Sequence, residues 1–258
     1  MSEDHVLIEK AGGVLTLTLN RPEKKNALTR AMYAALGGAI DGAADDPEVR
    51  CVLIQANGDM FTAGNDVADF AAANAGGKLE NAEANPLLAA LARAKIPLVA
   101  AVHGRAVGIG TTMLLHCDLV YVAQDALLTT PFVNLALVPE AASSLLLPAR
   151  IGHARAFEMF VLGKGVDGVT AAAWGIANAA VPASELRAVA RTGAEAIAAK
   201  PPSAVAITKA LMREAAEVLS ARMAEEGQHF KAQLQTPEAA EAFAAFAQKR
   251  APDFSKVS

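Results

Sequence analysis

Predicted strands alternate with predicted helices through the first half of the chain, and this alternation restricts the possible folds more than any other feature. Residues 14–19 alternate in side-chain character with a period of two, which predicts a half-buried strand. Thr29 and Asn85 each precede a stretch with apolar residues on one helical face, so each is predicted to cap a helix. Continuous apolar runs, typical of strands buried on both faces, occupy residues 51–54, 97–102 and 119–122. The first half is therefore predicted to be an α/β core.

In the last third of the chain the predicted strands stop and only helical periodicity remains. Ser184, Ser203 and Thr236 each precede such a stretch and are the expected N-caps. We therefore divide the chain into an α/β core, residues 1–182, and a helical C-terminal region, residues 183–258.

The overall composition argues against several classes of partner. The chain has 258 residues and a formal net charge of −4, without a run of Lys and Arg. A nucleic-acid surface is therefore not expected, and a polyanionic ligand would need local basic residues. No stretch of about 18 uncharged apolar residues predicts a membrane span. Cys51 and Cys117 lie in apolar stretches without metal-binding spacing, which predicts buried free thiols and suits a cytoplasmic protein.

Several common catalytic and cofactor motifs are missing from the sequence. It has no G-x-S-x-G elbow, no HExxH and no Walker loop. Gly108 and Gly110 follow a predicted strand, as in a dinucleotide-binding fingerprint, but Met113 occupies the position of the third glycine. A dinucleotide-binding fold is therefore not favoured, and no metal is predicted.

Two loops rich in small residues each follow a predicted strand, at residues 61–66 and 103–110. Glycine lets a backbone approach a ligand closely, and the first N–H groups of a helix have no acceptor within that helix. Two such loops could direct two N–H donors at one oxygen, as an oxyanion hole requires. Tight strand-to-helix turns without a ligand explain the same residues equally well, so this reasoning leaves both interpretations open.

Several segments, in their order and spacing, resemble the crotonase family, which is also called the enoyl-CoA hydratase/isomerase family. They are Asn20–Leu28 (NRPEKKNAL), Phe61–Asp66 (FTAGND), Ala100–Gly110 (AAVHGRAVGIG), Cys117–Asp118 and Phe246–Phe254 (FAQKRAPDF). The likeness covers nearly the whole chain. It implies an α/β fold with a spiral core of ββα units, C-terminal helices that cover the site, and assembly into homotrimers or homohexamers.

The resemblance also implies the residues that bind an acyl-coenzyme A thioester as substrate, with no further cofactor. The backbone N–H groups of Asn65 and Ile109 would form the oxyanion hole. The residues expected beside the bound acyl-CoA are Lys24, Lys25, Ala63, Gly64, Asp66, Val67, Gly108, Thr112, Phe132 and Lys249. For Lys249 a solvated helix face is an equally good interpretation.

The carboxylates indicate which reaction to expect. A hydratase of this family uses two glutamates, but Thr112 and Phe132 stand at the two positions, and neither is an effective general base. Glu140, within Val138–Ser144, resembles instead the single catalytic glutamate of one branch of the Δ3,Δ2-enoyl-CoA isomerases. Its apolar neighbours are expected to raise its pKa. A carboxylate favoured by a helix N-terminus is the structural alternative for Glu140.

The predicted function is a Δ3,Δ2-enoyl-CoA isomerase that moves a proton between C2 and C4 in fatty acid or related acyl-CoA metabolism. Enoyl-CoA hydratase activity, or another reaction through a thioester enolate, is the second hypothesis. A CoA-binding assembly protein without catalysis is the third, and the presence of Glu140 argues against it. Acyl-CoA and further copies of the chain are the predicted partners, with neither nucleic acid nor membrane.

Overall fold

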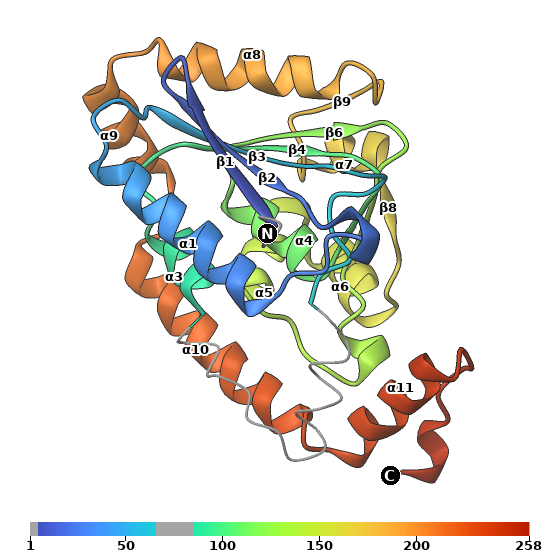
Figure 1. Cartoon of the computed structure of the whole chain (residues 1–258). Helices are drawn as coiled ribbons and strands as arrows, with labels where there is room; N and C mark the ends of the chain where they lie inside the picture. The colour runs from blue at the N-terminus through green and yellow to red at the C-terminus, as the bar shows by residue number, and fades with distance from the viewer. Residues whose placement is uncertain (1–4, 66–84, 258) are drawn as a thin grey trace.

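The computed structural model describes residues 5–65 and 85–257, and a six-stranded sheet forms the centre of this part of the chain (Figure 1). Its strands lie in the order β1 (Val6–Ala11), β2 (Val14–Leu19), β3 (Cys51–Ala56), β4 (Leu98–Val102), β6 (Leu119–Ala123) and β9 (Ala179–Val181). β1 and β2 form an antiparallel hairpin, whereas the later neighbours pair in parallel. The continuous apolar runs are β3, β4 and β6, as predicted.

Two strands of the large sheet are each followed in the chain by a strand of a second, smaller sheet. It contains β5 (Arg105–Val107), β7 (Leu127–Thr129) and β8 (Val166–Asp167). The chain passes from β4 directly to β5, and from β6 directly to β7. Repeated passage from the large sheet to the small one, followed by helical segments, produces the ββα spiral that was predicted.

Helices follow the strand pairs in the core. They are η1 (Pro22–Lys24), α1 (Arg30–Asp45), α3 (Pro86–Arg93), α4 (Ile109–Thr112), η3 (Met113–His116), η4 (Val133–Leu135), α5 (Ser143–Ile151), α6 (His153–Val161) and α7 (Gly168–Trp174). The predicted caps of α1 and α3 are confirmed, because the Thr29 side chain accepts from the N–H of Met32 and the Asn85 side chain from that of Leu87.

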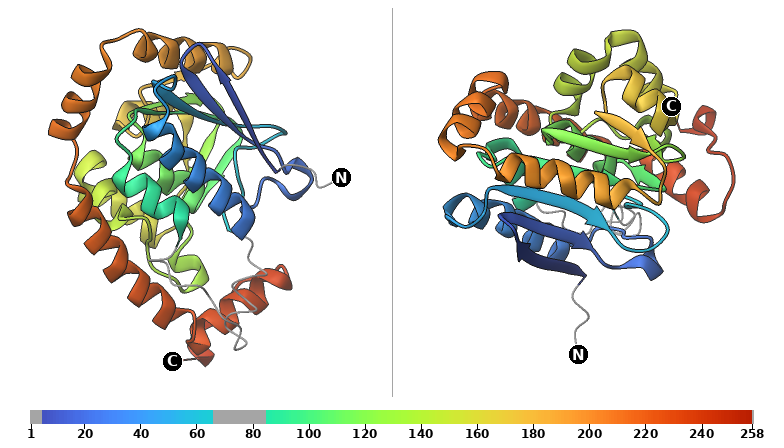
Figure 2. Two further views of the ribbon diagram at one scale, coloured as in Figure 1. Left: turned by 60° about the vertical axis from the view of Figure 1, so that its left-hand side comes forward. Right: turned by 90° about the horizontal axis from the view of Figure 1, so that it is seen from above.

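The C-terminal region consists of helices that lie against different parts of the core. They are α8 (Leu186–Ala198), α9 (Pro202–Met212), α10 (Ala216–Gln233), α11 (Pro237–Ala247) and the short turn η5 (Phe254–Lys256). α8 lies across the large sheet on the side opposite α1 (Figures 1 and 2) and contacts β2, β3, β4 and β6. α10 contacts α3, and α11 contacts η4.

Two of the predicted N-caps are wrong. α8 begins at Leu186 after Glu185, and no side chain caps it; a turn closed by the N–H of Glu185 on the carbonyl of Pro182 leads into it instead. α9 begins at Pro202, because the fixed φ of proline suits the first helical position. Ser184 and Ser203 are therefore not caps, whereas the Thr236 cap of α11 is confirmed.

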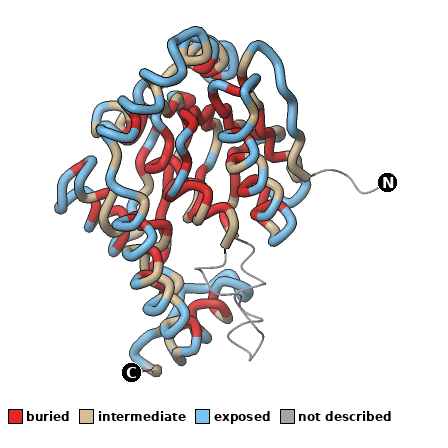
Figure 3. The backbone as a smooth tube through the Cα atoms, turned by 90° about the vertical axis from the view of Figure 1, so that its left-hand side faces the viewer, coloured by how far each residue is buried: buried red, intermediate tan, exposed pale blue. Residues whose placement is uncertain are grey.

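Buried residues form a continuous core between the sheets and the helices (Figure 3). Cys51 and Cys117 are both buried free thiols, as predicted. In the described ranges we find no helix with the length and apolar character needed to cross a membrane.

Candidate active site

The two glycine-rich loops, which follow β3 and β4, pack directly against each other. The N–H of Thr62 donates to the carbonyl of Arg105, and the N–H of Val107 donates to the carbonyl of Thr62, at 3.1 Å each. Gly64 has a φ of 83°, and a Cβ there would lie 2.6 Å from the carbonyl oxygen of Val107. Only glycine permits this approach.

Asn65 and Ile109, the predicted N–H donors, line the same pocket, which has a volume of about 290 Å³. Ile109 is the first residue of α4 and follows Gly108, whose φ is 56°. Its N–H therefore has no acceptor within the helix. Within the described residues, no hydrogen bond uses the N–H of Asn65 or of Ile109. The two predicted donor residues therefore lie at one pocket.

Apolar side chains from both regions of the chain form the rest of the pocket wall. The core and the C-terminal helices contribute Val107, Phe132, Leu135, Leu137, Phe230, Ala242 and Phe246. Phe132 is 6% exposed and packs on Phe160 with ring centroids 6.1 Å apart. Because Phe230 belongs to α10 and Phe246 to α11, the C-terminal helices help to enclose the pocket, which suits an apolar thioester.

Glu140 is hydrogen-bonded to α4, the short helix that begins with Ile109. The hydroxyl of Thr112, the last residue of α4, donates to Glu140 Oε1 at 2.6 Å. Glu140 is partly buried and does not itself line the 290 Å³ pocket, although Leu137 does. Burial raises the pKa of Glu140 to about 8; the Thr112 hydrogen bond lowers it and the charge of Glu226 raises it further. A carboxyl with this pKa can both accept and return a proton near neutral pH.

Tyr33, on the buried face of α1, was not predicted from the sequence. Its hydroxyl donates to Asn65 Oδ1. Burial raises the pKa of Tyr33 well above its usual value, and the charge of Glu140 raises it further. Tyr33 therefore lies close to both the loop of Asn65 and the carboxylate. A polar hydroxyl beside Met32 on an otherwise apolar helix face was the available signal.

The model of one protein family, enoyl-CoA hydratase/isomerase, matches residues 9–257 of the chain. The chain belongs to this family. Its relatives include both activities: it is 36% identical over 213 residues to enoyl-CoA delta isomerase 2 of Rattus norvegicus. It is 32% identical over 255 residues to 2,3-dehydroadipyl-CoA hydratase of Escherichia coli (strain K12). The relatives alone therefore do not separate isomerase from hydratase.

The coverage of these relatives differs. The match to the rat isomerase spans 81% of the chain but only 54% of that protein, so the chain spans about half the length of the first curated relatives that it matches. The match to the E. coli hydratase covers 98% of the chain and 99% of the hydratase. The chain thus corresponds to the whole length of one relative and to part of the other.

Two solved structures share the fold of the chain. The structure of Pseudomonas aeruginosa OdaA is 46% identical, with a TM-score of 0.87 over 95% of the chain and 99% of OdaA. An enoyl-CoA hydratase/isomerase from Pseudoalteromonas atlantica T6c is 40% identical, with a TM-score of 0.91 over 97% of the chain and 100% of that structure. These agreements confirm the crotonase-type fold.

In this member of the enoyl-CoA hydratase/isomerase family, Lys25 contacts the first glycine-rich loop. Lys24 and Lys25 are exposed, and the carbonyl of Lys25 accepts from the N–H of Ala63 at 2.9 Å. The Lys25 ammonium pairs with Asp59 at 2.5 Å. Asp66 and Val67, which complete the predicted CoA-binding segment, lie outside the described residues.

The C-terminal basic residue nearest the pocket is Arg250. Lys249 is exposed beyond α11, with a φ of 53°, and does not line the pocket. Arg250 does line it and forms two hydrogen bonds with the carboxylate of Glu241. Arg250 was not predicted, because Lys249 and Arg250 are adjacent basic residues and the sequence does not show which one turns inward.

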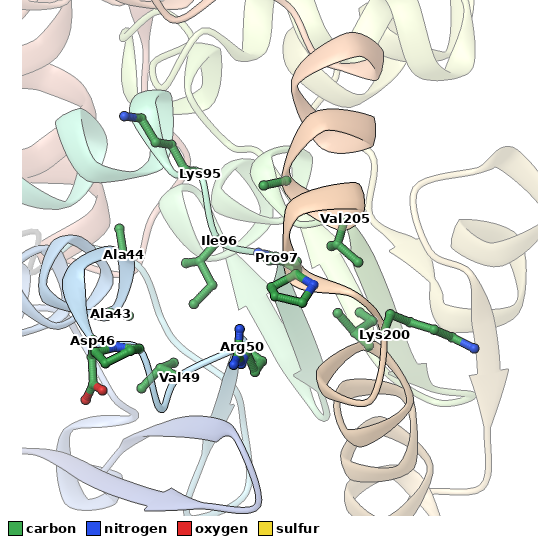
Figure 4. Close-up of a pocket in the computed structure, with 14 residues that line it drawn as sticks. Ala43, Ala44, Asp46, Val49, Arg50, Lys95, Ile96, Pro97, Lys200 and Val205 are labelled. Carbon is green, nitrogen blue, oxygen red and sulfur yellow. The ribbon is translucent and has the colours of Figure 1, made fainter.

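A separate pocket of about 210 Å³ lies between α1, α9 and the strand ends, away from this site (Figure 4). It is lined in part by Arg50, Lys95 and Lys200, but the ammonium groups of Lys95 and Lys200 point away from its centre and from each other. Its charges therefore do not converge on one ligand. Throughout the described ranges, no group of His, Cys, Asp and Glu side chains is suited to hold a metal ion.

Proposed function

We propose that the chain is a Δ3,Δ2-enoyl-CoA isomerase in which Glu140 is the general base. One observation carries the proposal. The Thr112–Glu140 hydrogen bond of 2.6 Å joins a carboxylate to α4, the helix whose first residue lines the pocket. An oxyanion donor at the start of a short helix and a base hydrogen-bonded to the last residue of that helix keep a fixed distance from each other, as catalysis of enolate formation requires.

The proposed reaction needs one base because nothing is added to the substrate or removed from it. Glu140, as the carboxylate, takes a proton from C2 of a 3-enoyl-CoA, and the C–H electron pair is delocalised onto the thioester oxygen. The N–H groups of Asn65 and Ile109 stabilise the resulting dienolate. Glu140 then returns the proton to C4, and the double bond moves into conjugation between C2 and C3. Atoms and charge balance, and the base is regenerated.

The residues at the two hydratase positions support isomerisation over hydration. Thr112 donates its hydroxyl proton to Glu140 and cannot also activate a water as a carboxylate would. Phe132 is buried against Phe160 and has no proton to transfer. Addition of water across the double bond would lack the second carboxylate on which the two-glutamate mechanism depends.

Replacement of Glu140 by glutamine tests the proposal. We expect Glu140→Gln to lower isomerisation of 3-hexenoyl-CoA at least about a hundredfold, as loss of a general base does. The rate is followed by the ultraviolet absorbance of the conjugated product. Glu185→Gln, an exposed glutamate before α8, is the matched control and is expected to retain full activity. Undiminished turnover by Glu140→Gln would exclude Glu140 as the base.

Hydratase activity is the second candidate, supported by the full-length match to a relative named 2,3-dehydroadipyl-CoA hydratase. Hydration of crotonyl-CoA, measured beside isomerisation on the same preparation, separates the two. A chain that binds CoA in calorimetry but catalyses neither reaction would instead be a CoA-binding assembly protein.

Binding and assembly form the remaining part of the proposal. We propose that the exposed lysines 24 and 25 contact the phosphates of CoA, which is supported by the hydrogen bond from the first glycine-rich loop to the backbone carbonyl of Lys25. Large apolar side chains are exposed on α9, with Ile207, Leu211 and Met212 exposed by 61%, 82% and 83%. Their exposure supports a homotrimer or homohexamer, which light scattering of the purified protein would measure.

A further inference from the structure

Two residues in an unfavourable backbone conformation directly follow Glu140. Ala141 and Ala142 have φ values of 61° and 54°, in the left-handed region that residues with a Cβ rarely adopt. Both alanines are buried, at 1% and 0% exposure. Because they connect Glu140 to the start of α5, their conformation sets how the backbone of Glu140 is oriented relative to α5. Contacts from outside the loop must hold this conformation.

Glu226 of α10 holds the loop from one side. Its Oε2 accepts from the N–H of Ala142 at 2.6 Å, and its Oε1 accepts from the N–H of Ser144 at 2.9 Å. Glu226 is only 5% exposed. It lies at the N-terminal end of α5, where the helix dipole favours a negative charge. Burial raises the pKa of Glu226, whereas the two N–H donors favour the ionised form.

His116 of η3 holds the same loop from the other side. Its Nε2 is 2.8 Å from the carbonyl oxygen of Ala141, and its Nδ1 is 3.2 Å from the Arg213 guanidinium. Arg213 can only donate, so Nδ1 accepts and Nε2–H donates to Ala141. Burial lowers the pKa of His116 to about 4, so the ring is neutral at neutral pH. Three hydrogen bonds from two elements thus converge on the residues that follow Glu140.

We propose that Glu226 is a positioning residue for Glu140: it anchors the loop through two N–H groups and places a second negative charge beside the base. The proposal rests on the role of Glu140 as base. The charge of Glu226 helps to raise the pKa of Glu140, and Thr112 opposes it. Arg222, one turn earlier on α10, lowers the pKa of Glu226, and the Tyr33 hydroxyl lies within the field of Glu140. The covering helix therefore contributes directly to the reactivity of the base.

The experiment compares three variants at one helix and records kcat against pH. Glu226→Gln keeps the size but removes the charge and one of the two acceptor oxygens. Glu226→Asp keeps the charge but shortens the reach. Glu225→Gln is the matched control, because it removes the same charge from the neighbouring, exposed position of α10. Circular dichroism and thermal melting of each variant establish that the protein compared is folded.

We expect the plateau of kcat to fall about tenfold in Glu226→Gln and Glu226→Asp, as the loss of a charge-assisted anchoring bond does. The rate depends on ionised Glu140, so it rises with pH through the pKa of Glu140. Removal of the neighbouring charge lowers that pKa, and the acidic limb of Glu226→Gln moves to lower pH. Glu226→Asp and Glu225→Gln should retain the wild-type limb.

A folded Glu226→Gln whose acidic limb is unmoved would overturn the proposal, even if its plateau is lower, because helix capping alone would then explain Glu226. If Glu226→Gln does not fold, a Glu226→Asp variant with wild-type kcat is the overturning result. Failure of the proposed function is seen separately: it would appear as full activity of Glu140→Gln, whatever the variants of Glu226 do.

Discussion

Removal of the Thr112 hydroxyl should shift the pH at which the enzyme becomes active. The hydroxyl donates to Glu140 Oε1 at 2.6 Å and lowers the pKa of Glu140, which is about 8 with this bond in place. A hydrogen bond to a charged group contributes about 1.5–3 kcal/mol. Since one pKa unit corresponds to about 1.36 kcal/mol, Thr112→Val should raise the pKa of Glu140 by about one to two units.

The effect on the rate follows from the ionised fraction of Glu140. At pH 7 roughly one-tenth of the wild-type carboxyl is ionised, and the variant retains about a tenth to a hundredth of that fraction. We therefore expect isomerisation to fall about ten- to a hundredfold at pH 7 and to recover as the pH is raised above 9. The assay is kcat for 3-hexenoyl-CoA between pH 6 and 10.

The neighbouring threonine supplies a matched control. Thr111 is also buried, but its hydroxyl lies 2.7 Å from the carbonyl oxygen of Ala106 and 3.1 Å from that of Thr129, and not near Glu140. Thr111→Val should lower the melting temperature without moving the pH profile. A Thr112→Val variant whose acidic limb coincides with that of the wild type would refute the electrostatic reasoning.

Two further predictions concern the first glycine-rich loop and the effect of the buried Glu140 carboxyl on the stability of the protein. Gly64→Ala should lower kcat about a hundredfold, because the new Cβ would lie 2.6 Å from the carbonyl oxygen of Val107 and separate the two N–H donors. One such donor contributes about 3 kcal/mol. Gly42→Ala, in open space on α1, is the control and should leave kcat unchanged. Glu140→Gln should melt at a higher temperature than the wild type at pH 9 and at nearly the same temperature at pH 5. The pKa of Glu140 in the folded protein, about 8, exceeds the ordinary value of a glutamate, so the wild type loses on the order of a few kcal/mol of stability as the pH rises from the ordinary pKa to the folded one. Equal melting temperatures at pH 9 would contradict this.

Much of the core could be predicted from the sequence because local signals determine it. Thr29, Asn85 and Thr236 cap helices through contacts within three residues, which a single sequence displays. Ser184 and Ser203 have the same local appearance but do not cap, because a turn and a proline define those helix starts. A favourable residue type does not guarantee that the backbone adopts the geometry a cap requires.

The candidate site divides in the same way. Asn65 and Ile109 were predicted as a pair because each follows a glycine in a loop after a strand, and both line one pocket. Glu226 could not, because its partner Ala142 is 84 positions earlier in the chain and nothing local distinguishes it from the exposed Glu225. Tyr33 reaches Asn65 across 32 positions for the same reason. Contacts between distant elements depend on packing, which periodicity does not reveal.

Because His116 stays neutral until the pH is well below the pKa of Glu140, reversible loss of activity on acidification should be separate from loss of the folded structure. Acidification from pH 8 to pH 5 would protonate the Glu140 carboxyl, whose pKa is about 8, while the imidazole stays uncharged, since its pKa is about 4. Activity lost in that interval should return at once when the pH is restored. Below about pH 4 the ring would become a cation whose Nδ1–H faces the Arg213 guanidinium, so that a donor faces a donor and two positive charges lie together. Acid inactivation should therefore have two stages, the first instantaneous and the second dependent on refolding.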